Sequence, residues 1–169
     1  MDRNSTLKRI SDYGNENELI EINKAMSLPD KEFALAVVNQ NGSFLRYMPE
    51  LKADRDVVLA AVRKNGFALE YASAALQADK EVVLAAVNNW GHSLEYASPE
   101  LKKDRDVLMA AATKIGNKIY KYTSGIDEQL NADLLNVIRR VNADWLNGRH
   151  GGSRRRKRRH SRKRRSRKI

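Results

Sequence analysis

A 25-residue segment recurs along the chain without a gap, and it constrains the fold more than any other sequence feature. The two central copies are KADRDVVLAAVRKNGFALEYASAAL at 52–76 and QADKEVVLAAVNNWGHSLEYASPEL at 77–101. A third copy follows at 102–126, and a degenerate copy precedes them at 29–51. Because one unit of this length cannot bury its own apolar face, neighbouring copies must stack into a solenoid or compact array.

Each copy is predicted to be a helix, a sharp turn and a second, shorter helical piece. The Asp that heads each copy, with Glu or Asp two residues later, is typical of an N-cap at the positive end of a helix dipole. A Gly recurs 12 residues after the Asp, and we expect it to end the helix in the left-handed conformation. These positions are Asp30, Asp54, Asp79 and Asp104, and Gly42, Gly66, Gly91 and Gly116.

The apolar positions indicate how the copies pack. Paired alanines in the middle of the first helix allow neighbouring helices to approach closely, and Ser98-Pro99 indicates that a further helical turn begins there. An apolar stripe defines the second piece. The alanines are Ala60, Ala61, Ala85, Ala86, Ala110 and Ala111, and the stripe is Leu45, Leu69, Leu94 and Ile119 with Tyr47, Tyr71 and Tyr96.

The whole chain is predicted to be all-α, with four tandem helical repeats, flanking helices and a disordered basic C-terminal tail. Residues 1–28 form an N-terminal segment with a capping helix at 16–26, and the repeats occupy 29–126. A second capping helix occupies 127–148, and the tail occupies 149–169. That second helix is expected to start at Asp127 and end at Gly148, with its apolar face at Leu130, Leu134, Ile138, Val141 and Trp145.

The phrase DRDVVLAAVRKNGFALEYAS, repeated as DKEVVLAAVNNWGHSLEYAS, resembles the repeat of the family named domain of unknown function 4116. The resemblance covers about residues 29–126, and the outer copies depart from the pattern. Arg46 replaces a Glu in the first, and Tyr120 and Lys121 replace a Glu-Tyr pair in the last. It implies an all-helical repeat found in bacteria, protists and large DNA viruses, and it implies no activity.

The sequence offers no constellation typical of an enzyme, a cofactor site or a metal site. It has no cysteine, its three histidines are scattered, and it has no Walker loop, dinucleotide fingerprint or nucleophile elbow. Glu70 and Glu95 occupy equivalent positions beside tyrosines, which a repeat produces automatically, so we expect solvent-facing carboxylates and not an acid/base pair. We therefore predict a non-enzymatic protein without a cofactor.

A column of basic residues recurs beside the acidic column at the start of each first helix. We expect the two columns to neutralise each other on a solvated face. The basic residues are Lys31, Arg55, Lys80 and Arg105.

Trp90 stands where earlier copies have Asn41 and Asn65, just before the turn Gly. A large aromatic side chain at this position, if partly exposed, is a candidate contact for a partner. The alternative is that it packs against the next copy or the C-terminal helix, as Ile115 would.

The tail is the strongest functional signal in the sequence. Residues 149–169 hold 13 of the 32 Lys and Arg residues and none of the 21 acids, which leaves the preceding residues with 19 basic and 21 acidic side chains. After a Gly-Gly-Ser hinge the segment has no apolar residue before Ile169, so it is expected to be disordered when free. Its like charges repel one another, and we therefore expect its binding partner to be a polyanion.

Nucleic acid, DNA or RNA, is the expected partner of the tail. Each neutralised phosphate releases counterions, and about 8 to 10 engaged charges on duplex DNA give a slope of log K against log salt of about −7 to −9. Such binding carries no base specificity, because the tail has no aromatic residue to stack on bases. The expected binding residues are Arg154, Arg155, Arg156, Lys157, Arg158, Arg159, Arg162, Lys163, Arg164, Arg165, Arg167 and Lys168.

Two serines in the tail, Ser161 and Ser166, follow basic residues in the way that basophilic kinases recognise, and we advance them as hypothetical phosphorylation sites. A phosphate subtracts about 1.5 to 2 charges and so weakens binding to a polyanion.

The sequence supports two functions, which share the repeats as a platform for an unidentified protein. In the first, the chain is an adaptor held on nucleic acid by its tail, and the resemblance to a family of large DNA viruses points to genome packaging or a virion. In the second, the tail is only a nuclear or nucleolar address read by an import receptor. We expect an intracellular, soluble protein without a membrane anchor, since no apolar run approaches the roughly 18 residues of a membrane span and the N-terminus lacks a signal.

Overall fold

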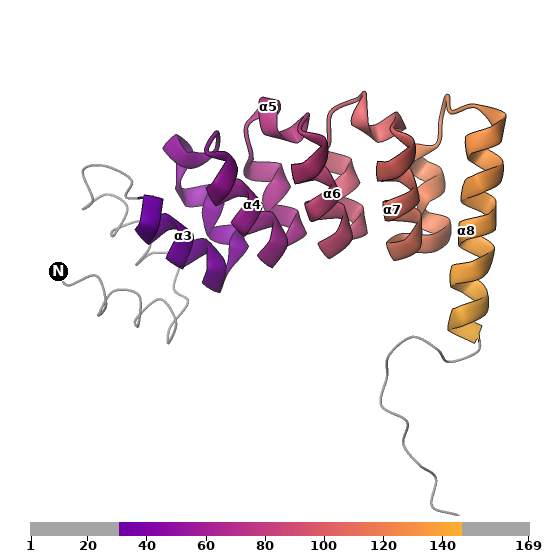
Figure 1. Ribbon diagram of the computed structural model, residues 1–169, viewed down its shortest axis with the longest axis horizontal. Helices are drawn as coiled ribbons and strands as arrows, with labels where there is room; N and C mark the ends of the chain where they lie inside the picture. The colour runs from indigo at the N-terminus through magenta and orange to yellow at the C-terminus, as the bar shows by residue number, and fades with distance from the viewer. Residues whose placement is uncertain (1–30, 147–169) are drawn as a thin grey trace, which may run out of the picture.

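The computed structural model describes residues 31–146, in which every regular element is a helix. Four similar α-helices follow one another along the long axis of the molecule, and a longer helix closes the row at its C-terminal end (Figure 1). The predicted all-α repeat architecture is therefore confirmed. The helices are α3 (Lys31–Gln40), α4 (Arg55–Lys64), α6 (Lys80–Asn89), α7 (Arg105–Ile115) and α8 (Glu128–Leu146).

The second piece of each copy is a 3₁₀-helix, and a short third turn follows it in the first three copies. At the third of these turns, Ser98 Oγ accepts a hydrogen bond from the Leu101 N–H at 3.3 Å, which confirms the turn predicted at Ser98-Pro99. The 3₁₀-helices are η1 (Gly42–Tyr47), η3 (Gly66–Tyr71), η4 (Gly91–Tyr96) and η6 (Gly116–Tyr122), and the third turns are η2 (Pro49–Leu51), α5 (Ala74–Gln77) and η5 (Leu101–Lys103).

The predicted N-caps form at the starts of α4, α6 and α7. Asp54 Oδ1 accepts hydrogen bonds from the Asp56 and Val57 N–H groups at 3.0 and 3.1 Å. Asp79 and Asp104 cap their helices in the same way. A cap of this kind stabilises a helix by about 1 kcal/mol, because the first N–H groups have no partner inside the helix. Asp30 lies outside the described residues.

The glycines of three copies have a different role from the one predicted. Only Gly116, with φ of 52°, has the positive φ that the sequence interpretation assigned to all four. A Cβ on Gly42 would lie 2.1 Å from the Ala61 carbonyl oxygen, and one on Gly66 would lie 2.4 Å from that of Ala86. The 3₁₀-helices η1, η3 and η4 thus pack directly on the α-helix of the next copy, and the left-handed interpretation was wrong for Gly42, Gly66 and Gly91.

Equivalent residues of successive copies form one continuous core. The central side chain of each 3₁₀-helix is fully buried, and one alanine of each pair is fully buried where helices meet, while the other is partly buried. Burial of such a leucine contributes about 1.5–3 kcal/mol. The fully buried residues of these two columns are Leu45, Leu69, Leu94, Ile119, Ala61, Ala86 and Ala111.

Helix α8 covers the exposed side of the last repeat, as the sequence predicted. Asp127 Oδ1 accepts from the Leu130 N–H at 2.7 Å, which confirms the predicted start of the helix. Leu130, Leu134 and Ile138 are buried against the repeats. The predicted N-terminal capping helix at 16–26, the Trp145 side chain and Gly148 lie outside the described part of the chain.

Candidate functional site

The basic residues and serines predicted in the tail, which is the segment 149–169, lie outside the described residues. The described part ends with α8 at Leu146, immediately before the tail in sequence. The described repeats still constrain the function, because they show which charges are already paired and which surfaces remain open.

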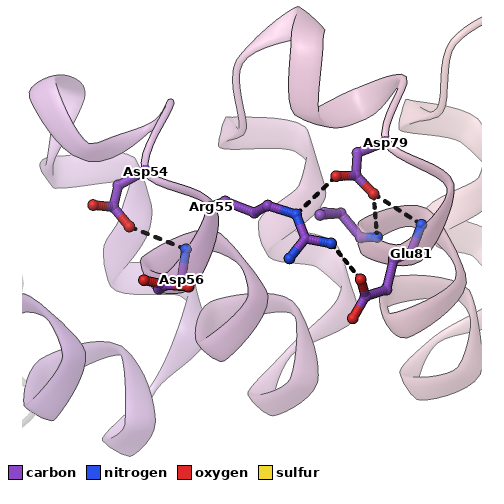
Figure 2. Close-up of polar contacts among 6 residues, drawn as sticks. Asp54, Arg55, Asp56, Asp79 and Glu81 are labelled. Atoms are coloured by element: carbon purple, nitrogen blue, oxygen red, sulfur yellow. Dashed lines mark hydrogen bonds and ion pairs between the residues drawn. The ribbon is translucent and has the colours of Figure 1, made fainter.

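The basic column pairs with the acidic column across each junction between repeats. Arg55, at the start of α4, points toward the start of α6 (Figure 2). Its Nε donates to Asp79 Oδ2 at 2.9 Å, and its Nη2 donates to Glu81 Oε2. Because Asp79 is also the N-cap of α6, a single carboxylate both starts that helix and holds the preceding repeat.

The same arrangement recurs along the array. Lys31 contacts Asp54 and Asp56, Lys80 contacts Asp104 and Asp106, and Arg105 Nη1 lies 2.7 Å from Asp133 Oδ2 on α8. These inter-repeat ion pairs confirm the predicted neutralised face. Residues 31–146 hold fifteen Lys and Arg against fifteen Asp and Glu, so the described body carries no formal net charge.

The ion pairs change the ionisation of the capping aspartates. The hydrogen bond from Arg55, opposed by partial burial, lowers the pKa of Asp79, and the N–H groups of Val82 and Glu81 lower it further. The Asp79 side chain therefore stays ionised into more acidic solution than a free aspartate. This behaviour is typical of a structural carboxylate, whereas a general acid needs a raised pKa.

The column of Glu70 and Glu95 faces solvent, as predicted, beside half-buried tyrosines. Lys121 Nζ donates to Glu95 Oε2 at 3.0 Å, and this hydrogen bond and charge lower the pKa of Glu95. A carboxylate with a lowered pKa is a weaker base. The geometry therefore gives no support to acid/base chemistry at this column.

Within the described range, no group of three His, Cys, Asp or Glu side chains is placed to hold a metal ion. His92 is the one described histidine of the three in the chain. No described helix is long and apolar enough to cross a membrane.

Trp90 is partly exposed, which is the condition that the sequence analysis set for a partner contact. Its side chain is 39% exposed, and its ring lies 5.7 Å from the ring of Phe67 in the preceding repeat and 5.5 Å from that of His92. The expectation of packing against the next copy has to be corrected to this extent, since the nearest rings belong to the preceding repeat and to η4. The exposed part of the indole borders an open hollow.

The hollow has a volume of about 570 Å³ and lies where the ends of α6 and α7 meet η4, η6 and α8. Ile115 and Val141 contribute apolar atoms to it. Its polar lining includes His92, Lys114, Asn117, Lys118 and Asn142, and none of the described residues that line it is an Asp or Glu. The site therefore offers an aromatic surface, hydrogen-bond donors and positive charge together.

Of these lining residues, the sequence analysis proposed only Trp90 as a contact for a partner, and it named Ile115 as the equivalent residue one copy later. Lys114, Lys118 and Asn142 come from three segments whose meeting depends on how the last repeat packs against α8. One signal was present in the sequence, because Lys114 occupies the repeat position that Asn89 holds one copy earlier.

Comparison with known proteins agrees with this architecture. The model of one family, described as "Domain of unknown function (DUF4116)", matches residues 30–77 and 79–126. Each match spans two of the 25-residue units seen in the structure. Neither a curated protein nor a solved structure matches the chain. Since the two matched segments together make up more than half of the 169 residues, the chain belongs to the family Domain of unknown function (DUF4116).

Proposed function

We propose that this chain is a non-enzymatic adaptor whose basic tail binds DNA or RNA electrostatically while the helical repeats present a surface to a protein partner. The observation that carries the proposal is the separation of charge. Residues 149–169 hold 13 basic and no acidic side chains, whereas residues 31–146 hold equal numbers of both. The tail is therefore the part of these two segments that attracts phosphates over a long range.

The structure of the repeats supports this division of labour. The basic residues at the helix starts are engaged by carboxylates of the next repeat, and so their charge is already compensated. The stacked repeats offer an extended surface of the kind that repeat proteins use for partners. A neutral platform joined to a cationic tail can hold a protein partner on nucleic acid, for example in genome packaging or a virion core.

The experiment is a salt titration of duplex DNA and RNA binding by the full-length protein. Its matched variant, the tail-Gln variant, carries glutamine at the twelve tail positions predicted to bind. We expect a slope of log K against log salt of about −7 to −9 for the parent and loss of binding in the tail-Gln variant. A control variant, Lys102→Gln with Lys103→Gln, removes two positive charges from the body and should bind as the parent does.

The alternative function has its own supporting observation, because RRRKRRHSRKRRSRK also matches the composition of a nuclear address. In that case an import receptor binds the tail, and the purified chain binds neither DNA nor RNA near physiological salt. That result would overturn the adaptor proposal and favour the address.

A further inference from the structure

Two asparagines make the polar contacts around the start of η3. Asn65 Oδ1 accepts from the Phe67 N–H at 3.1 Å and so caps η3. Asn89 Oδ1 accepts from the Gly66 N–H at 2.8 Å, and its Nδ2 donates to the Arg63 carbonyl oxygen at 2.9 Å. The two Asn89 contacts join the backbone of the second copy to the helix of the third, whereas the Asn65 cap lies within the second copy.

Both asparagines are replaced at the equivalent positions one copy later. Trp90 stands where Asn65 would cap, and η4 accordingly has no side-chain cap. Lys114 stands where Asn89 would bridge. A lysine carries only donors, so it cannot accept from the Gly91 N–H as Asn89 accepts from that of Gly66. Lys64 makes the same replacement at the first junction, but there Asn41 retains its cap.

The two replacements remove the cap of η4 and the bridge that Asn89 makes one copy earlier, and they place an aromatic and a basic side chain at the surface. Loss of an Asn cap lowers the stability of the helix that it starts. Departures from local rules without a structural gain are expected at functional sites. Here they coincide with the hollow beside Trp90, and together they place an exposed indole face next to two lysines.

The local charge of this hollow is positive. Neither Lys114 nor Lys118 forms an ion pair with a described residue. Burial first, and then the positive charges of Lys118 and Lys121, lower the pKa of His92, whereas Glu95 raises it. Glu95, the nearby acid, is held by Lys121 at 3.0 Å. An anionic group is therefore favoured in the hollow.

We propose that the hollow beside Trp90 binds one unpaired nucleotide of single-stranded nucleic acid, with the base stacked on the indole and the phosphate bound by Lys114 and Lys118. An aromatic surface beside positive charge is how proteins hold single strands without reading sequence. Within a duplex the base faces are already stacked on one another, so an internal base cannot stack on the indole. The proposal rests on the proposed function, since the tail attracts the strand and the hollow then adds a preference for its unpaired form.

The test compares a short oligothymidine with a duplex of equal length, using anisotropy and the full-length protein. Trp90→Asn introduces the residue found in the first two copies, which can cap η4, and circular dichroism checks that the variant keeps the helix content of the parent. We expect it to bind oligothymidine about tenfold more weakly and the duplex unchanged, as expected for loss of one stacked base. The matched control is Tyr120→Asn, which removes an aromatic side chain that is 44% exposed and does not line the hollow.

A second measurement separates this proposal from the function on which it rests. In a Trp145→Phe background the fluorescence reports Trp90 alone, and oligothymidine should quench it, even in the tail-Gln variant at higher concentration. If oligothymidine quenches the fluorescence but the parent does not bind duplex, the proposal for the tail is overturned and the proposal for the hollow stands. If Trp90→Asn binds oligothymidine as tightly as the parent does, or loses affinity equally for the duplex, the proposal that the hollow binds a nucleotide is overturned.

Discussion

Replacing Gly66 by alanine adds one methyl group where η3 packs against α6. The new Cβ would lie 2.4 Å from the Ala86 carbonyl oxygen, 2.7 Å from Ser93 Oγ and 3.0 Å from Trp90 Cβ. Ordinary contact begins at 3.4 Å, so the two repeats must separate by about 1 Å at this point. No side-chain rotation relieves the first contact, because the oxygen belongs to the backbone of α6.

The cost follows from what that separation disturbs. The same Ala86 oxygen accepts a hydrogen bond from the Trp90 N–H at 2.8 Å, and Leu69 and Val83 beside the junction are fully buried. Overpacking a tight interior costs about 1–3 kcal/mol, and the short contact with backbone places Gly66→Ala near about 3 kcal/mol. The lower chain entropy of alanine in the unfolded state offsets only about 0.4–1 kcal/mol of this.

Urea unfolding followed by far-UV circular dichroism and tryptophan fluorescence measures this difference in the free energy of unfolding. The matched variant is Gly125→Ala, where φ is 78° and nothing lies within 4 Å of the added Cβ, so only backbone strain of about 1–2 kcal/mol is expected. If Gly66→Ala instead left stability unchanged, or raised it by about 0.4–1 kcal/mol as for a glycine with room around it, the packing argument would be refuted.

Further changes test the core, the caps and the ion pairs. Leu94→Ala empties a fully buried position and should lower the free energy of unfolding by about 2–5 kcal/mol in urea titrations. Asp79→Ala removes a cap and should cost about 1 kcal/mol, whereas Asp79→Asn keeps the cap acceptor and should cost less by the same assay. Because Arg55 lowers the pKa of Asp79 in the folded state, the contribution of this carboxylate is present above its unfolded pKa and is lost as the pH falls through the lowered folded value. In Arg55→Gln the melting temperature should therefore fall less steeply as the solution is made acidic. An unchanged dependence of melting temperature on pH would contradict the effect assigned to Arg55. Asp127→Ala should cost about 1 kcal/mol at the start of α8, and hydrogen exchange should show faster opening of that helix turn.

Much of the repeat could be predicted because its signals are local. An Asp before a helix supplies its own acceptor to the first N–H groups, and so Asp54 and Asp79 identified their helix starts without knowledge of any neighbour. The alternation of apolar positions likewise identified Leu69 and Leu94 as core residues. The same local reasoning failed for Gly66, since a missing Cβ serves a turn and a close contact equally well.

The candidate site was less predictable than the fold. Trp90 could be selected from the sequence because the two preceding copies have asparagine at its position. Its neighbours Lys118 and Asn142 could not, since they are 24 residues apart in sequence and meet only because α8 folds back on the last repeat. The charge column was correctly predicted to be neutralised. Which carboxylate meets Arg55 was decided by the offset between successive repeats, which no single copy contains.

By itself, the sequence determined the all-helical repeat, its period, its caps, its core columns and the separation of the basic tail from the body, because each depends on neighbours in the chain or on composition. Tertiary structure alone decided the direct contact of η1, η3 and η4 with the next repeat, the pairing of Arg55 with Asp79 and Glu81, and the open hollow beside Trp90. The physical reason is that these features are set by the distance and angle between repeats, and packing fixes that geometry only when all the copies are stacked.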